Sequence, residues 1–488
     1  LSPSPKGKEV ALISRGDVYV TSVEGDFTAR ITDTPEQERG VSFSKDGRTI
    51  YYASERNGEW GIWRSSLENK KDNYFCISQK FKEERFTKEG ETCFQPAVSP
   101  DGKWVAFLRD RTEVVIKKTN GGGEKSLLKG VNYSYADGDQ SFEWSPDSRY
   151  LLCTYMADGG WNHEDVALIN IEDGSIVNLT ESGYSDDNFR WALKGKAMTW
   201  QSDKAGFRSH GSWGAGGGIY LMFFNDKEFA DFKKTEKDEE FDKLIKSADK
   251  KAEKKEKKDS LDKEKKSEKL ELELERREDR IVRLTSHSGR LGDYYLTDDG
   301  EKLYYTVLLE KSRDLCCLEV KKKSIKVIKK GFSGAFIPSA DGKDLYVLTA
   351  MGASKMDIKS GTLKTISFKG EYEYYPYKER EYVFNHVWKQ VSEKFYDPQI
   401  HGVDWAGIKE NYALFLPYIN NSRDLVELLS EMLGELNASH TGARYFNLSL
   451  GAPSVGCIGV IFDEEYKGKG LKIKELLRGG ALSVSDPE

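Results

Sequence analysis

The sequence predicts a mainly β protein, with a seven-bladed β-propeller followed by a small helical domain and the start of a further domain. A turn phrase recurs seven times through residues 1–370, the hydrophobic period changes from two to 3.6 after Pro376, and a strand pattern returns after Ser454. At 488 residues the chain is too long for one ordinary core, and length alone favours about two to four domains.

The recurring phrase is a turn signal followed by a strand. In Ser99-Pro100-Asp101-Gly102, proline sets φ and Asp-Gly supplies a tight reversal, and the alternating run 103–108 follows at once. The other copies begin at Ser4, Ser44, Ser145, Leu193, Thr297 and Ser339. Copies spaced by roughly 40 to 55 residues are typical of a radial array of four-stranded blades. The copy near Gly195 is degenerate, and the abrupt start of the first blade leaves open that it lacks a strand.

A run built mainly of Lys, Glu and Asp, from about 226 to 280, interrupts one blade. Such a composition cannot bury enough apolar surface to fold on its own, so we expect a solvated or partly helical insertion. Strand pattern resumes at 280–285, which matches the blade-ending segment 177–180.

After Pro376 apolar residues recur three and four apart. Val383, Val387 and Val391 mark one helix, which breaks at Asp397-Pro398. Two more helices are expected, one around 405–416 and one around 425–436. Together they predict a small helical domain over residues 371–450.

Two segments of this domain are distinctive: His401-Gly402-Val403-Asp404-Trp405 and Leu433-Gly434-Glu435-Leu436-Asn437-Ala438-Ser439-His440-Thr441-Gly442. With Phe395-Tyr396-Asp397, they make the domain closely similar to the first core domain of the tricorn protease family. The resemblance covers about 371–450, and the propeller region agrees more loosely. It implies a serine peptidase of the tail-specific protease superfamily that degrades oligopeptides handed down by larger proteases. It also implies a homo-oligomer without a metal or organic cofactor.

His440 is the candidate general base. The third helix ends just before it and leaves an imidazole beside the hydroxyl of Ser439. An imidazole, with an ordinary pKa of about 6.5, suits proton transfer from a serine to a leaving amine near neutral pH. The resemblance assigns the base role to His440, and to Ser439 a place in the relay that orients the imidazole. Ser439 is not expected to be the nucleophile, because adjacent side chains point apart.

The other five histidines receive no catalytic role. His386 and His401 show no metal-site pattern, so structural roles are expected, with His401 fixing the loop before the second helix. His163, His210 and His287 lie in or beside glycine-rich loops, and of these His210 is the one expected to face a channel. The six cysteines show no CxxC spacing and are expected to be buried or incidental thiols.

From Ser454 to Glu488 the chain reads as the beginning of a PDZ-like domain, incomplete at the end of the sequence. The run 455–462 is glycine-rich and apolar, and a strand pattern follows at 471–477. Such a module offers backbone amides to a peptide carboxylate and a strand that pairs with the peptide. In the resembled family the nucleophile, the oxyanion amides and the relay acid lie beyond this point. We therefore expect the 488 residues alone to be inactive, as a piece of a larger protein.

Composition excludes several other classes. The net charge of −6 comes without a basic face, and no apolar run reaches 18 residues, so neither nucleic acid nor a membrane is an expected partner. The absence of a Gly-x-Ser-x-Gly elbow weakens a propeller-capped α/β-hydrolase. The alternative left open is a noncatalytic propeller that binds peptides or partner proteins. The few cysteines favour the cytoplasm, and a periplasmic location stays open.

Overall fold

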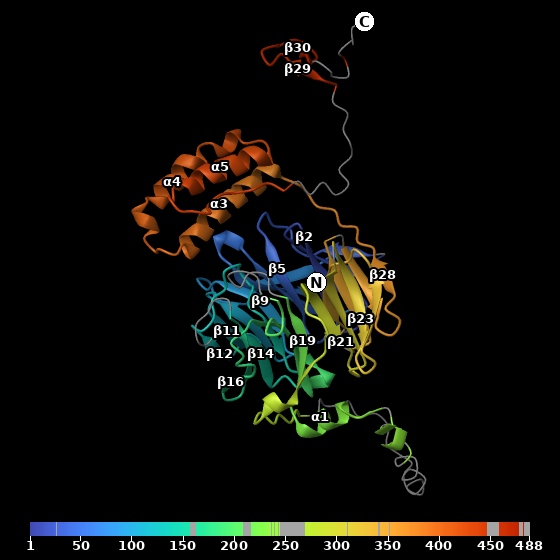
Figure 1. Ribbon diagram of the computed structural model, residues 1–488. Helices are drawn as coiled ribbons and strands as arrows, with labels where there is room; N and C mark the ends of the chain where they lie inside the picture. Colours follow the sequence, from blue (N-terminus) through green and yellow to red (C-terminus); the bar gives the residue numbers. More distant parts are fainter. Residues whose placement is uncertain are drawn as a thin grey trace. The chain divides into compact units, whose positions relative to one another are not determined.

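The computed structural model describes residues 1–25, 27–156, 163–207, 216–235, 237–238, 240–242, 244, 269–309, 311–339, 342–350, 352–446, 458–477 and 482. They form two compact units, Leu1–Pro398 and Gln399–Glu488. The first unit holds the propeller and the long helix α3 (Pro376–Lys394), and the second holds α4 (Trp405–Ala413) and α5 (Ser422–Gly434) (Figure 1). The predicted boundary at 370/371 stays a prediction.

Seven four-stranded antiparallel sheets confirm the propeller, and each is built from consecutive strands. Blades 1 to 4 are β1 Ser2–Pro3, β2 Glu9–Ser14, β3 Asp17–Ser22, β4 Thr28–Arg30; β5 Glu38–Phe43, β6 Thr49–Ser54, β7 Gly61–Leu67, β8 Phe81–Arg85; β9 Cys93–Val98, β10 Trp104–Arg109, β11 Glu113–Lys118, β12 Glu124–Lys129; and β13 Phe142–Trp144, β14 Tyr150–Tyr155, β15 Asp165–Asn170, β16 Ile176–Asn178. Blades 5 to 7 are β17 Asp186–Ala192, β18 Ala197–Ser202, β19 Gly218–Phe223, β20 Ile281–Arg283; β21 Leu291–Leu296, β22 Lys302–Leu309, β23 Ser312–Glu319, β24 Ser324–Lys329; and β25 Ala335–Pro338, β26 Asp344–Thr349, β27 Gly352–Asp357, β28 Leu363–Ile366. Blade 1 lacks no strand, although its first strand has two residues.

The turn phrases join the first and second strands of the blades, and local hydrogen bonds explain why. In blade 3 the Ser99 hydroxyl donates to Asp101 Oδ1 (2.6 Å) and accepts from the Trp104 amide (3.0 Å). Asp101 Oδ1 also accepts from the Lys103 amide (3.0 Å). Ser44, Ser145 and Thr297 repeat the hydroxyl-to-aspartate contact. The hydroxyl and the carboxylate therefore satisfy the backbone donors of a tight reversal.

Side-chain packing joins the first blade to the last. Val10 and Val23 of blade 1 pack with Tyr346 and Ile366 of blade 7, and all four are buried. In the described part of the chain these two blades exchange no strand. The ring is therefore closed by an apolar cluster rather than by a shared sheet.

The charged segment between β19 and β20 begins with α1 (Asp226–Phe232) and ends with the 3-10 turn η4 (Arg277–Arg280). We expected the run to be solvated, but its last part packs against the propeller. Leu272 and Leu274 contact the core of blades 4 and 5, and the Leu270 amide donates to Asp147 Oδ2 (3.0 Å). Leucines two residues apart lie on one face of an extended chain and form no helical stripe, so the helical period in the sequence did not predict this packing.

Each helix has a recognisable start. Pro376 occupies the first turn of α3, the Asp404 carboxylate accepts from the Gly407 amide at the start of α4 (3.0 Å), and the Asn421 side chain caps α5. The face of α5 that is buried carries Leu425, Leu428, Leu429, Met432 and Leu433. Short 3-10 turns are η1 Arg56–Gly58, η2 Leu193–Gly195, η5 Ile400–Gly402 and η6 Leu416–Tyr418.

Beyond residue 457 the described residues include one hairpin, β29 (Val460–Phe462) paired with β30 (Ile473–Leu476). A hairpin alone does not define a PDZ-like domain, so that assignment stays a prediction. No helix in the described residues is long and apolar enough to cross a membrane.

Candidate functional site

Ser439 and His440 lie in a loop directly after α5. Both residues are exposed. His440 has φ of 62° and Asn437 has φ of 48°, which places two non-glycine residues of one short loop in the left-handed region. The imidazole is therefore accessible, as a general base must be, and it is not sealed inside a core.

No catalytic neighbour is assembled around His440 in the described residues. Neither His440 nor Ser439 makes a side-chain hydrogen bond within that part of the chain. The assignment of both residues therefore stays a prediction.

The two ends of this loop are held to the helical unit. At its start, Nδ1 of His401 lies 3.0 Å from the carbonyl oxygen of Leu436. At its end, the Ala443 amide donates to the Ser430 hydroxyl (3.1 Å). Leu436 itself is 1% exposed. His401 lies in the segment before α4, and this contact ties it to the end of α5; its expected role in fixing the loop before α4 stays a prediction.

His386 pairs with the propeller. Its Nδ1 lies 2.7 Å from a carboxylate oxygen of Glu55, whose side chain is 2% exposed. The Tyr382 hydroxyl, one turn earlier on α3, donates to the same carboxylate. This geometry agrees with the expected structural role, because the imidazole and the phenol satisfy a buried carboxylate.

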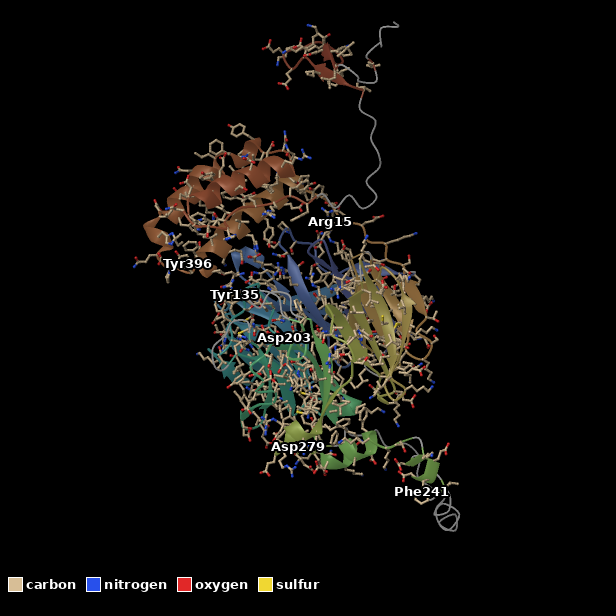
Figure 2. The ribbon with its side chains drawn as sticks, in the orientation of Figure 1. Arg15, Tyr135, Asp203, Phe241, Asp279 and Tyr396 are labelled. Atoms are coloured by element: carbon tan, nitrogen blue, oxygen red, sulfur yellow. The ribbon has the colours of Figure 1, made fainter. Side chains whose placement is uncertain are left out.

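The last turn of α3 makes a second contact, with a propeller loop at residues 131–141. Arg111 donates to Asp137 (2.9 Å) and to Glu393 of α3 (2.8 Å), and Lys394 pairs with Asp137 (2.8 Å). Lys394 also donates to the Tyr135 carbonyl (2.8 Å), and Figure 2 labels Tyr135 on this side of the propeller. Burial opposes ionisation of Asp137, but Lys394 and Arg111 outweigh it and lower its pKa. The cluster is therefore held in its charged form.

The same loop borders a cavity of about 570 Å³ at the centre of the ring. The first strands of four successive blades, β5, β9, β13 and β17, supply its walls, and Asp137, Gly138 and Gln140 add one edge. Inner strands line the central channel of a propeller, so this cavity is part of that channel.

Arg190 and Glu143 line this cavity. Arg190 contacts Asp293 (2.8 Å), and Glu143 Oε2 accepts from the Trp191 amide (3.0 Å). Burial raises the pKa of Glu143 to about 7, with Arg190 acting against the rise. For Arg190, burial opposes the charge, but Asp293 and Glu143 outweigh it and raise the pKa.

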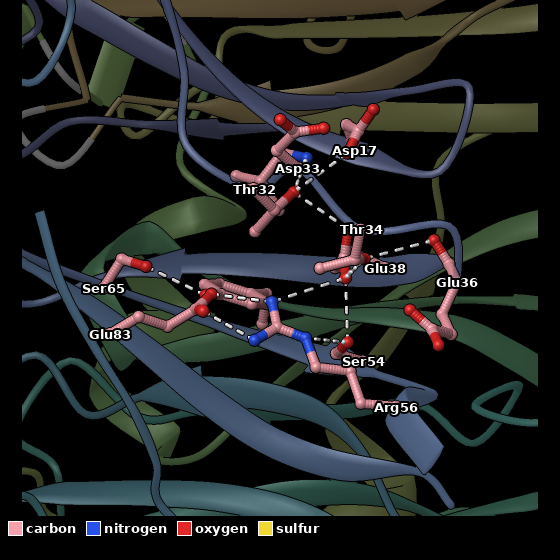
Figure 3. Close-up of polar contacts among 12 residues, drawn as sticks. Asp17, Thr32, Asp33, Thr34, Glu36, Glu38, Ser54, Arg56, Ser65 and Glu83 are labelled. Atoms are coloured by element: carbon pink, nitrogen blue, oxygen red, sulfur yellow. Dashed lines mark hydrogen bonds and ion pairs between the residues drawn. The ribbon is translucent and has the colours of Figure 1, made fainter. Parts of the chain in front are cut away.

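Another polar cluster is centred on Glu38 of blade 2 (Figure 3). The Glu38 carboxylate is 1% exposed and accepts from Thr32 (2.8 Å), Thr34 (3.0 Å) and Ser54 (2.8 Å). Arg56 lies 3.7 Å from Glu38 and binds Glu83 with two nitrogens. Burial raises the pKa of Glu38 to about 7 although the three hydroxyls and Arg56 lower it.

No group of histidine, cysteine and carboxylate ligands suited to a metal occurs in the described part of the chain. His210 lies outside the described residues, so its expected position at a channel is untested. His163 is exposed, and His287 lies beside Tyr305.

The chain is a multidomain protein with a β-propeller followed by helices and an exposed histidine. Comparison with known proteins shows which proteins it resembles. Residues 376–434 match the model of the Tricorn protease C1 domain. The "Putative Tricorn-like protease C-terminal subunit" of Sulfurisphaera tokodaii is 22% identical over 98% of this chain and 53% of its own. The "Tricorn protease homolog" of Saccharolobus solfataricus is 21% identical over 98% of this chain and 42% of its own.

The fold comparison agrees. The crystal structure of the tricorn protease superimposes with a TM-score of 0.64 and 14% identity, over 94% of this chain and 43% of that one. Residues 376–434 are therefore similar to the Tricorn protease C1 domain, and nearly the whole chain is similar to tricorn-like proteins. It spans about half the length of the curated relatives it matches.

Sequence reasoning missed the residues that join α3 to the propeller. Glu55 and His386 are 331 positions apart, and Arg111 and Glu393 are 282 apart. The sequence offered no signal for either pair, because the blade arrangement alone brings them together.

Proposed function

We propose that this chain supplies the general base of a serine peptidase of the tricorn type, and that His440 is that base. The observation that supports the proposal is an exposed imidazole in a strained loop at the end of a helix that lies within the match to the tricorn C1 domain. In this reaction His440 takes the proton of a serine as it attacks a peptide carbonyl, and returns it to the leaving amine. An acyl-enzyme forms, and water releases it.

The nucleophile is proposed to lie outside these 488 residues. Among the described residues, no serine is hydrogen-bonded to His440. Ser439 is proposed to act in the relay that orients the imidazole, because as the adjacent residue it is badly placed for attack by its own hydroxyl.

Substrate and setting follow as further parts of the proposal. Substrates are unfolded oligopeptides, since the channel at the ring centre excludes folded chains by size. The protein works as a homo-oligomer in the cytoplasm, without a metal or organic cofactor.

The test uses the complete product of the reading frame. Peptidase activity on fluorogenic oligopeptides is measured for the natural protein, for His440→Ala and for His163→Ala, a matched change at another exposed histidine. Removal of a catalytic base lowers kcat by roughly a hundredfold or more, while His163→Ala leaves it unchanged. A complete protein without peptidase activity supports the noncatalytic alternative, and an active His440→Ala enzyme overturns the base assignment.

A further inference from the structure

We propose that His401 and Ser430 are positioning residues, which hold the loop between Leu436 and Ala443 so that His440 is presented in one orientation. The inference rests on the proposed role of His440 as the base. It assigns to two side chains of the helical unit a part in catalysis through another residue.

The first contact fixes where the loop begins. A carbonyl oxygen only accepts hydrogen bonds, so the 3.0 Å approach of His401 Nδ1 to the Leu436 oxygen requires a hydrogen on Nδ1. Leu436 comes two residues after α5 ends, where carbonyl groups lack helical partners. His401 therefore satisfies a carbonyl that the helix cannot, and it ties the loop to the segment before α4.

The second contact fixes where the loop ends. Ser430 lies on α5, and its hydroxyl accepts from the Ala443 amide (3.1 Å) and approaches the Ala443 carbonyl (3.4 Å). One side chain thus holds both backbone groups of the residue that closes the loop. Between the two ends, the Thr441 hydroxyl donates to the Ala438 carbonyl (3.1 Å).

The backbone between these contacts is strained. Asn437 and His440 both have positive φ, at 48° and 62°, and each costs roughly 1–2 kcal/mol in that region. Such conformations persist only where the surroundings enforce them. His401 and Ser430 contact the two ends of the loop from outside it, and we infer that they supply that enforcement.

The orientation of His440 matters because proton transfer depends on geometry. A displacement of about 1 Å at a reacting group costs on the order of a hundredfold in rate. An exposed imidazole on an unrestrained loop samples many orientations, whereas a loop held at both ends limits them. A positioning role acts on the proton-transfer step, so its effect is expected in kcat rather than in KM.

The test compares His401→Asn with His401→Asp. Both side chains tolerate the left-handed backbone of His401 (φ 55°), and they have the same shape. Asparagine keeps an N–H donor for the Leu436 carbonyl, and aspartate replaces it with a carboxylate. Ser430→Ala and Ser430→Thr form a second pair, in which threonine keeps the hydroxyl.

Two measurements are made. In the complete protein, His401→Asp and Ser430→Ala lower kcat by roughly tenfold to a hundredfold with KM changed less than about twofold, and Asn and Thr restore most of the rate. In the 488-residue chain, amide hydrogen exchange over residues 437–443 becomes faster by about tenfold in the same two variants.

The outcomes separate this inference from the proposed function. Equal exchange and equal kcat in all four variants, with His440→Ala inactive, overturn the positioning role and leave the base assignment standing. Faster exchange without any change of kcat also overturns it. An enzyme that does not need His440 removes the proposed function itself, and the exchange data alone then show whether the two residues hold the loop.

Discussion

Glu38 shows how one buried side chain makes the propeller sensitive to pH. Burial raises its pKa from an ordinary 4.5 to about 7, so the folded protein holds a proton that the unfolded chain releases between these values. The free energy of unfolding therefore falls as the pH rises from about 4.5 to about 7, by roughly 3 kcal/mol from this group.

Glu38→Gln removes that dependence, because glutamine stays uncharged. We expect the stability of the variant, relative to the natural protein, to improve by roughly 3 kcal/mol between pH 4.5 and pH 8. Thermal or denaturant unfolding at several pH values measures it, with Glu68→Gln at an exposed position after β7 as the control. A constant difference across this range would show that Glu38 titrates normally.

For single residues, the sequence indicated which side chain carries the proposed chemistry, but not how a side chain's surroundings change its pKa. It pointed to His440 through the segment 433–442, and the structure leaves that imidazole exposed. It gave no indication of the raised pKa of Glu38, because the cause is burial, and burial of Glu38 depends on packing within blade 2.

Among the elements, α3 lies within the residues that match the Tricorn protease C1 domain and also contacts the propeller. Its last turn contacts Arg111 and Asp137, and its middle contacts Glu55. Asp137 borders the central cavity, and Arg111 holds Asp137. These are charge-assisted hydrogen bonds to groups that are nearly or fully buried, which are worth about 1.5–3 kcal/mol each. The last turn of α3 therefore helps to hold the loop at residues 131–141 in place.

Glu393→Gln tests this link. The change weakens the contact with Arg111, and we expect amide exchange in residues 131–141 to become faster by roughly threefold to tenfold, equivalent to about 1 kcal/mol. Glu381→Gln, the same change at an exposed site on the same helix, is the control. If both variants exchange alike, α3 does not hold the loop.

The elements were predicted where their signals are local. The turn phrases marked the start of the second strand in the blades because Ser99 and Asp101, like their counterparts, bond within about five residues of backbone. The packing of Leu272 and Leu274 was missed, because an extended segment surrounded by charge carries no helical period.

For the whole molecule, the joint between blades 1 and 7 is the point on which the ring depends. Tyr346 is fully buried there, beside Val10 and Val23, and its hydroxyl makes a long contact with the Gly7 carbonyl (3.4 Å). Because these blades share no strand in the described residues, apolar packing supplies the closing energy.

Tyr346→Ala is expected to destabilise the propeller by about 3–5 kcal/mol, as for other large-to-small changes in a core. Tyr346→Phe keeps the ring and should cost less than about 1.5 kcal/mol. Denaturant unfolding followed by tryptophan fluorescence distinguishes them. Equal stability of the two variants would mean that this cluster does not hold the ring together.

The propeller could be predicted because each blade carries one copy of the turn phrase. The seven phrases in the sequence correspond to the seven four-stranded sheets. The contacts of α3 with the ring were not, because they join residues about three hundred positions apart.

The central claim is that His440 activates a serine. The most direct measurement is the rate at which a serine-directed fluorophosphonate labels the complete protein, in its natural form and as His440→Ala, across pH 5 to 9. We expect labelling of the variant to be slower than labelling of the natural protein by roughly a hundredfold. Equal labelling rates in the two proteins would contradict the account.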